Sequence, residues 1–314
     1  MLCIVQRCLS PGVLRAAALN RPDVRRARLS MRTNELTESA GRETAPAPHE
    51  GSDVSAHAAG KAACVHRFDD FGLEDFLPVA ARFGADRFGY VVTPNVDHLI
   101  RCHEDGHFRS LCAAADFTLL DSRFAARLLR LLRGLRLPVC TGSDLTAALF
   151  ARIIRPVDRI VLVGGSGEQA EQIACTYGLR DVRHHNPPMG FIRDPQSVHA
   201  CLAFIEQASP FRFCFLAVGS PQQELIAGLL RQRAAARGLA LCVGASLDFL
   251  TGHERRAPRW LQLLSLEWLY RLAQNPRRLW IRYLVRGPRI FGYLRRAEVV
   301  LRKSAPSSPD PMSR

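Results

Sequence analysis

The sequence predicts an α/β protein with a Rossmann-like, mostly parallel sheet flanked by helices, followed by a C-terminal helical, basic appendage. Three observations lead to the sheet prediction. Short apolar stretches with the length of buried strands recur along the middle of the chain, each ends in a turn of small or polar residues, and each turn leads into a helical stretch. This repeated order is typical of a parallel sheet covered by helices.

The first half of the pattern supplies two strands. The α/β region begins near Val65, and the first strand is expected at 87–93, before a helix from about residue 96 to 112. A short strand at 117–120 precedes a helix at 122–132, whose arginines and leucines give it one polar and one apolar face.

The second half supplies three more strands, expected at 159–163, 211–218 and 239–243. Ligands of parallel sheets bind at the carboxyl ends of the strands, so the turns that follow the strands mark the predicted site. These turns are Gly164-Gly165-Ser166-Gly167, Gly219-Ser220-Pro221 and Gly244-Ala245-Ser246.

The composition changes after Thr251. Between Thr251 and Lys303 there are 13 Lys and Arg residues against three Glu, which places most of the net charge of +14 in this segment. All three tryptophans, Trp260, Trp268 and Trp280, lie in the same segment. The prediction is a set of helices that carry basic and aromatic faces.

Such helices suit an anionic membrane surface, because aromatic rings sit at headgroup depth while arginines meet lipid phosphates. No stretch of 18 or more apolar residues is present, so a transmembrane helix is not expected. A basic and aromatic surface also suits nucleic acid, but no helix-turn-helix, zinc-finger or RNP-like pattern accompanies the charge. A solvated helix face is the remaining alternative.

Four parts are expected along the chain. Residues 1–62 are rich in Ala, Arg, Ser and Pro without helical or strand periodicity. This part resembles a transit peptide in its arginines, and we interpret it as a disordered extension or the product of an upstream start codon, with Met31 as an alternative start. The catalytic α/β domain is expected at 63–250, the appendage at 251–303 and a disordered tail at 304–314.

The ten cysteines are scattered and form no C-x-x-C pair. Several lie in apolar stretches, where cysteine behaves as a small hydrophobic residue. The sequence therefore indicates a reducing environment and favours neither a zinc site nor a disulfide framework.

The glycine-rich turn at Gly164 and Gly165 raises a dinucleotide-binding alternative. Only the relaxed form G-x-G-x-x-A is met, because Ala170 stands at the last position, and no acidic residue ends the next strand. A nucleotide-dependent oxidoreductase is therefore the weaker hypothesis. Backbone N–H groups in this turn could still approach a nucleotide diphosphate.

Several polar residues are predicted at strand ends. Asp116 and Asp121 flank the short strand, and Asp121 lies at the carboxyl end, where a catalytic base is expected, whereas Asp116 is expected to be structural. Ser220 is expected to cap the next helix with Gln223 in a capping box, and Gln223 could also contact a ligand. Asp248 follows the last strand.

The order of these motifs resembles the WecG/TagA/CpsF family of bacterial glycosyltransferases over about residues 65–285. The resemblance rests on six blocks, which occur in family order: Thr93-Pro94-Asn95-Val96-Asp97-His98; Ala115 to Asp121; Val163-Gly164-Gly165; Ala217 to Glu224; Val243 to Phe249; and Arg256 to Trp260 with Glu267 to Arg271 and Pro276-Arg277-Arg278.

The resemblance implies an inverting transfer of a sugar from a UDP-sugar to a sugar on undecaprenyl diphosphate, without a metal or other cofactor. Asp121 would be the general base, with Thr93 and Asn95 in the same pocket. Gly164, Gly165, Gln223 and Asp248 would bind substrate. Arg271, Arg278 and Arg282 would neutralise the diphosphate leaving group.

The same resemblance implies a peripheral protein at the cytoplasmic face of the inner membrane, active in exopolysaccharide, capsule or cell-wall polymer synthesis. Nucleic acid is not an expected partner, and a homo-oligomer is left open. One position departs from the family, which usually has Asp-Gly where this chain has Asp121-Ser122. Besides the oxidoreductase, a non-catalytic membrane-docking protein remains an alternative.

Overall fold

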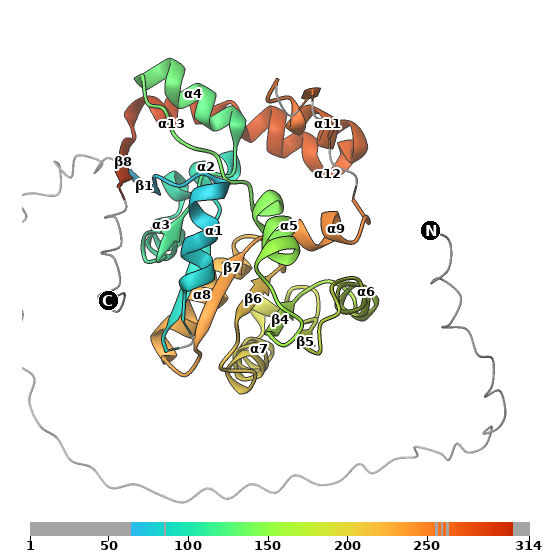
Figure 1. The fold of residues 1–314 in the computed structure, drawn as a ribbon. Helices are drawn as coiled ribbons and strands as arrows, with labels where there is room; N and C mark the ends of the chain where they lie inside the picture. The colour runs from blue at the N-terminus through green and yellow to red at the C-terminus, as the bar shows by residue number, and fades with distance from the viewer. Residues whose placement is uncertain (1–63, 85, 255–256, 259, 262–263, 304–314) are drawn as a thin grey trace, which may run out of the picture. The chain divides into compact units, whose positions relative to one another are not determined.

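A computed structural model describes residues 64–303 of the 314-residue chain, apart from 85, 255–256, 259 and 262–263 (Figure 1). The predictions for 1–62 and for 304–314 concern residues outside this described part.

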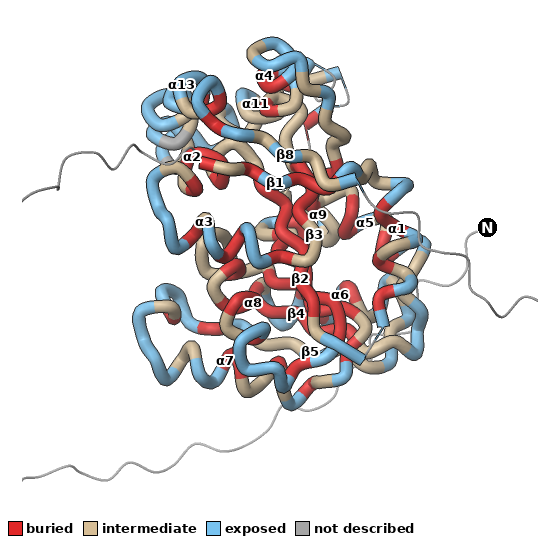
Figure 2. The backbone as a smooth tube through the Cα atoms, turned by 90° about the vertical axis from the view of Figure 1, so that its left-hand side faces the viewer, coloured by how far each residue is buried: buried red, intermediate tan, exposed pale blue. Residues whose placement is uncertain are grey.

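The centre of the fold is a sheet of six strands, all parallel, in the order β3-β2-β7-β6-β4-β5. The predicted α/β class is therefore confirmed. Every residue of the inner strands β6 and β7 is buried, as expected for strands covered on both faces. Figure 2 shows buried segments gathered at the centre of the molecule around β2 and β4. The strands are β2 (Phe88–Val92), β3 (Phe117–Thr118), β4 (Arg159–Val163), β5 (Asp181–His185), β6 (Phe213–Leu216) and β7 (Gly238–Cys242).

Alternate residues of each strand enter two different cores. Phe213 and Phe215 of β6 pack on one face of the sheet, while Cys214 and Leu216 pack on the other. Buried residues of α1 (Leu73–Arg82), α5 (Gly142–Arg152), α6 (Gly167–Tyr177) and α9 (Ser246–Leu250) join the first core. Those of α7 (Pro195–Gln207) and α8 (Gln222–Arg233) join the second.

Three details differ from the sequence prediction. The helix expected over 96–112 is two helices, α2 (Val96–Glu104) and α3 (Gly106–Ala113), because Asp105 ends the first and caps the second by accepting a hydrogen bond from the Phe108 N–H. Ser220 does not cap α8, since Pro221 occupies the cap position without a side-chain hydrogen bond. The short strand β3 pairs over two residues only.

The C-terminal segment is helical up to residue 296 and ends in a strand that was not predicted. Its described elements are α11 (Glu267–Gln274), α12 (Pro276–Trp280), the π-helix η2 (Ile281–Arg286), α13 (Arg289–Arg296) and β8 (Glu298–Arg302). β8 pairs in parallel with β1 (Val65–Asp69), the first described strand, so the two ends of the described chain meet in a separate two-stranded sheet. The predicted domain boundary at residue 250 stays a prediction.

A third core holds α13 against the rest of the protein. Ile290 and Leu294 of α13 are buried with Phe68 of β1, with Leu99 of α2 and with residues of α4 (Arg123–Arg133), and Figure 1 shows α13 beside α4. Arg133 of α4 donates hydrogen bonds to the carbonyl oxygens of Arg295 and Ala297 at 3.1 and 2.8 Å. The end of the C-terminal segment is therefore fixed to the rest of the protein through α13.

Shortening Leu294 should destabilise this attachment. Leu294 has no exposed surface, so Leu294→Ala leaves a cavity and is expected to lower the free energy of unfolding by about 2–5 kcal/mol. Leu269→Ala in α11 is the matched control, because that side chain is 45% exposed and its loss should change stability by about 0.5 kcal/mol or less. Urea unfolding of both variants measures the difference, and equal losses would contradict the packing described for α13.

Candidate functional site

Polar side chains from separate strands gather at the carboxyl edge of the sheet. Thr93 directly follows β2, Asp121 follows β3, and Ser246 begins α9 after β7. All three side chains lie next to Gly142 at the start of α5. A Cβ at this position would lie 3.1 Å from Thr93 Oγ1, 3.4 Å from Ser246 Oγ and 3.6 Å from Asp121 Oδ2. Any side chain larger than hydrogen at residue 142 would therefore crowd the cluster.

Backbone and side-chain hydrogen bonds fix this edge. The Thr93 hydroxyl donates to the Cys242 carbonyl at 3.0 Å, which joins the ends of β2 and β7. The Asp121 N–H donates to the Pro94 carbonyl at 2.9 Å, which joins the segments after β3 and β2. Ser122 then caps α4 by accepting from the Ala125 N–H at 3.1 Å. Asp121 is thus held between two ordered elements.

A cavity of about 450 Å³ opens beside Asp121. A volume of this size is sufficient for a small-molecule substrate. One wall comes from the starts of α2, α4 and α5, and it includes Asn95, Asp97, Asp121, Ser122 and Thr141. The other wall comes from the C-terminal segment and includes Ser265, Glu267, Trp268, Arg271, Tyr283 and Phe291.

The carboxyl of Asp121 has a raised pKa. Burial raises the pKa of its carboxyl to about 7, while the Arg271 guanidinium and the Gly142 N–H act to lower it and Glu267 acts to raise it. A base with a pKa near neutral pH is partly unprotonated under working conditions and still accepts a proton readily. Asp116 lies at the other end of β3. It pairs with Arg87 and Arg231 and accepts a hydrogen bond from the Tyr90 N–H, which are contacts of a structural residue.

Asn95 lines the cavity and also caps α2. Its side-chain oxygen accepts hydrogen bonds from the N–H groups of Asp97 at 3.0 Å and His98 at 3.4 Å, and it lies 3.0 Å from His98 Nδ1. The family resemblance implies that Asn95 lies in the pocket, but its role at the start of the helix that forms part of one wall was not predicted.

Arg271 is the only one of the three predicted arginines whose side chain is described. It lines the cavity, forms an ion pair with Glu267 at 3.0 Å within α11, and lies over the ring of Phe249 at 5.1 Å. These two contacts orient the guanidinium. The side chains of Arg278 and Arg282 lie outside the described part of the structure.

Gly164, Gly165 and Asp248 form a second group at the same sheet edge, and none of the three is among the described residues that line the cavity. Both glycines have positive φ, and a Cβ on Gly164 would lie 2.8 Å from the Ala217 carbonyl oxygen. Gln169 connects the turn to Asp248, because its side-chain oxygen accepts from the Ser166 N–H and its nitrogen donates to Asp248 Oδ1, both at 2.8 Å.

Gln223 is buried in a third network. It accepts from the Gly244 N–H at 2.9 Å and donates to Glu224 Oε1 at 2.7 Å, and the same oxygen lies 3.2 Å from His98 Nε2. Burial acts to raise the pKa of Glu224, but the bonds from His98 and Gln223 hold it below its usual value. The structure thus places Gln223 behind the cavity wall, where it links α2, α8 and the turn after β7.

Several cavity residues were not predicted from the sequence. Thr141 carried a signal, because Thr141-x-x-Asp144 is a capping pattern, and Thr141 Oγ1 accepts from the Asp144 N–H at 3.1 Å. Glu267 and Trp268 belong to the last of the six sequence blocks that resemble the family, but nothing in their spacing distinguishes them from solvent-facing residues.

Two of the acidic residues that line the cavity form ion pairs with arginines. Asp97 pairs with Arg101 at 3.5 Å, and Glu267 pairs with Arg271. The one group of three close metal-ligand residues found in the described part of the chain is Cys64, His66 and His103, which lies outside the cavity lining.

Comparison with known protein families identifies the family of this chain. The model of the family described as "Glycosyl transferase WecG/TagA/CpsF family" matches residues 64–304, which is more than three quarters of the chain. The match starts at the first described residue and extends through β8, so it includes both walls of the cavity.

Proposed function

The chain belongs to the WecG/TagA/CpsF family of glycosyltransferases, and from that premise we propose that it transfers a sugar from a UDP-sugar to a sugar carried on undecaprenyl diphosphate, with inversion. One observation carries the proposal: Asp121 and Arg271 line the same cavity, and burial brings the pKa of Asp121 to about 7 while the Arg271 guanidinium acts on the same carboxyl. A base and a cation facing one reaction space are the groups that such a transfer requires.

In the proposed reaction Asp121 removes the proton from the acceptor hydroxyl, and the oxygen attacks the anomeric carbon of the donor. The new C–O bond forms as the bond to UDP breaks, and UDP leaves with the electron pair. Arg271 stabilises the negative charge that develops on the leaving diphosphate, which is work that a divalent metal does in other transferases. We extend the same role to Arg278 and Arg282, and we propose that no metal takes part in this step.

The other predicted residues have supporting roles in this proposal. Thr93 and Asn95 shape the acceptor side, because Thr93 packs beside Asp121 and Asn95 sets the start of α2. The turn at Gly164 and Gly165 leads into α6, whose N-terminal N–H groups favour a phosphate. Asp248 and Gln223 hold the neighbouring turns, and we propose that this group receives the nucleotide.

Family membership favours the enzyme over the oxidoreductase and the non-catalytic docking protein. The direct test incubates the untagged protein with a panel of UDP-sugars and synthetic polyprenyl-diphosphate sugars, with chelator present. We expect transfer with one donor, and we expect UDP but not NAD to raise the melting temperature. Absence of transfer with every pair, or stabilisation by NAD alone, would overturn the assignment of substrate.

We further propose that the C-terminal segment docks on the cytoplasmic face of the inner membrane. No helix among the described residues is long and apolar enough to span a bilayer. Among the described residues, eight of the twelve exposed large hydrophobic side chains lie between residues 260 and 291, in the segment that also carries the excess of arginine. Exposed apolar side chains among arginines favour binding to an anionic interface.

Polar substitutions at Trp280 and Ile281 test this docking. Both side chains are about half exposed, at 49% and 48%, so the double substitution to serine should lose roughly 2 kcal/mol of insertion, or about 30-fold in affinity for vesicles containing anionic lipid. Cosedimentation measures the change. Val157→Ser is the control, because Val157 is 69% exposed just before β4, outside the segment. Equal binding by both variants would exclude this surface.

A further inference from the structure

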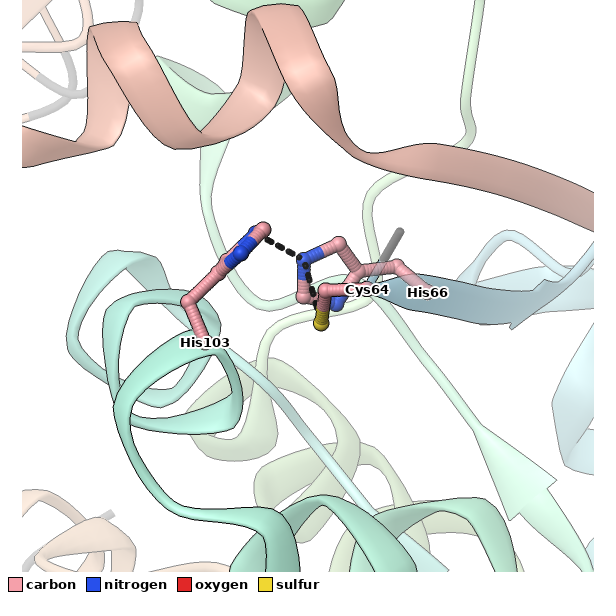
Figure 3. Close-up of side chains that lie close together, drawn as sticks. All are labelled: Cys64, His66 and His103. Carbon is pink, nitrogen blue, oxygen red and sulfur yellow. Dashed lines mark hydrogen bonds between the residues drawn. The ribbon is translucent and has the colours of Figure 1, made fainter. Parts of the chain in front are cut away.

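Three side chains that are good ligands for a transition metal meet where the two ends of the described chain come together. Cys64 precedes β1, His66 lies in β1, and His103 lies in the last turn of α2 (Figure 3). The two imidazole Nε2 atoms are 3.0 Å apart, Cys64 Sγ is 3.9 Å from His66 Nε2, and all three ligand atoms lie within 4.8 Å of one another.

These separations are close to those of a tetrahedral zinc site. With Zn–N bonds of about 2.0–2.1 Å and a Zn–S bond of about 2.3 Å, two nitrogen ligands lie about 3.3 Å apart, and a nitrogen and a sulfur ligand about 3.6 Å apart. Two of the observed separations, 3.0 and 3.9 Å, differ from the ideal values by a few tenths of an ångström. The third, between Cys64 Sγ and the ring of His103, is within 4.8 Å, so a rotation of one of these side chains is needed to bring all three ligands onto one ion.

The two histidine rings are arranged as metal ligands require. Their Nε2 atoms face each other at 3.0 Å, and the ring planes are inclined at 62°. A neutral imidazole offers the lone pair of one ring nitrogen to a metal, so both Nε2 atoms can bind the same ion. Burial raises the pKa of the Cys64 thiol, while a hydrogen bond from Arg109 acts against this. A metal would bind with release of the thiol proton.

We propose that Cys64, His66 and His103 bind one zinc ion, with a water molecule as the fourth ligand. The mixed sulfur and nitrogen set favours zinc over magnesium or calcium, which prefer oxygen ligands. The ion with one thiolate and two neutral imidazoles carries a net charge of +1. Arg109 is the cation that faces the site, and its contact with Cys64 stabilises the thiolate at some cost in repulsion from the ion.

The site lies where β1, α2 and α13 meet. β1 pairs with β8 at the end of the C-terminal segment, and the ring of His103 stacks on Tyr293 of α13 with centroids 4.5 Å apart and an interplanar angle of 8°. A zinc ion here would join β1 to α2 and support the contact with α13. None of its ligands is among the described residues lining the cavity, so the ion is independent of the proposed transfer reaction.

The sequence could not indicate this site. The cysteines form no closely spaced pair, and His103 is 37 residues from His66. Cysteine spacing reveals only zinc motifs whose ligands are close in the sequence. The ligands of this cluster are brought together by the packing of β1 on α2.

The test uses the untagged full-length chain, stripped with chelator and dialysed. We expect one equivalent of Co²⁺ to produce thiolate-to-cobalt charge-transfer absorption that Zn²⁺ then displaces, and we expect Zn²⁺ to raise the melting temperature by on the order of 5 °C. Cys64→Ser and His103→Asn should lose the absorption and the shift. His103 is only partly buried, so its variant is expected to fold, and circular dichroism will show whether it does.

Two matched variants control for binding elsewhere. Cys175→Ser and His107→Asn alter an exposed cysteine and an exposed histidine, and both should keep one equivalent and the full shift. The proposal is overturned if the wild type binds no equivalent with a thiolate signature, or if folded His103→Asn binds as the wild type does. In that case the cluster is a metal-free hydrogen-bonded pair of histidines.

Discussion

Replacing Asp121 by asparagine is expected to lower kcat/KM for sugar transfer by about 10²–10⁴-fold, because the amide keeps the shape of the carboxyl but cannot take the proton of the acceptor hydroxyl. The affinity for UDP should change little, since the nucleotide is proposed to bind through the turn at Gly164 and Gly165. Initial rates and UDP titration by calorimetry separate the two effects.

The pH dependence gives a second readout of the same substitution. Because only the unprotonated base is active, the wild-type rate should rise with pH through about 7 and then level off. The raised pKa also means that the folded protein binds this proton more tightly than the unfolded chain, so Asp121 costs stability increasingly as pH rises from about 4 to about 7. Asp121→Asn should remove that cost and raise stability at pH 8, by on the order of 2–4 kcal/mol.

Asp116→Asn is the matched control, because Asp116 lies at the other end of the same strand. It pairs with Arg87 and Arg231 and should lose stability while the folded enzyme keeps its activity and its pH profile. If Asp116→Asn lost as much activity as Asp121→Asn, or if Asp121→Asn transferred sugar at the wild-type rate, Asp121 would not be the base.

The parallel sheet could be predicted because its strands are short apolar stretches whose lengths and turns are local properties. Of the strands that were missed, β1 and β5 lack a continuous apolar stretch, whereas β8 contains the short stretch Val299-Val300-Leu301. β5 reads Asp-Val-Arg-His-His, with one strongly apolar residue, and it forms a strand because it completes the sheet edge beside β4. β1 and β8 form strands by pairing with each other, and this pairing joins residues more than 230 positions apart. No local pattern specifies such a partner.

The site was predictable in part for a related reason. Polar residues after parallel strands must lie at one edge, so the meeting of Thr93 and Asp121 follows from the fold class. The way in which the predicted residues divide among separate hydrogen-bond networks does not follow from the fold class. Asp121 and Arg271 share a cavity, whereas Asp248 is linked through Gln169 to Ser166, the residue after Gly165, and Gln223 is bound within the interior. Which side chains are used to hold neighbouring turns depends on tertiary hydrogen bonds that spacing does not encode.

Arg271→Ala is expected to reduce kcat by about 10²–10³-fold, because the alanine variant leaves the charge on the departing diphosphate without its described cation. The donor KM should change less than kcat, since the charge grows as the bond to UDP breaks. Single-turnover and steady-state rates measure the two. Arg277→Ala is the matched control, because Arg277 is an exposed arginine of the same segment and is not among the residues that line the cavity. Loss of donor affinity alone, with kcat intact, would make Arg271 a binding residue only.

Arg271 also acts on Asp121, and this coupling separates its electrostatic role from a purely structural one. The guanidinium works against the effect of burial on the Asp121 carboxyl, so its removal should raise the pKa of that group above about 7. The rising limb of the pH–rate profile should therefore move to higher pH in Arg271→Ala and return toward its wild-type position in Arg271→Lys, which restores the charge. A structural defect in α11 would reduce the rate at every pH without moving the limb. A lower rate with an unmoved limb would therefore show that the cation does not face the base across the cavity in the working enzyme.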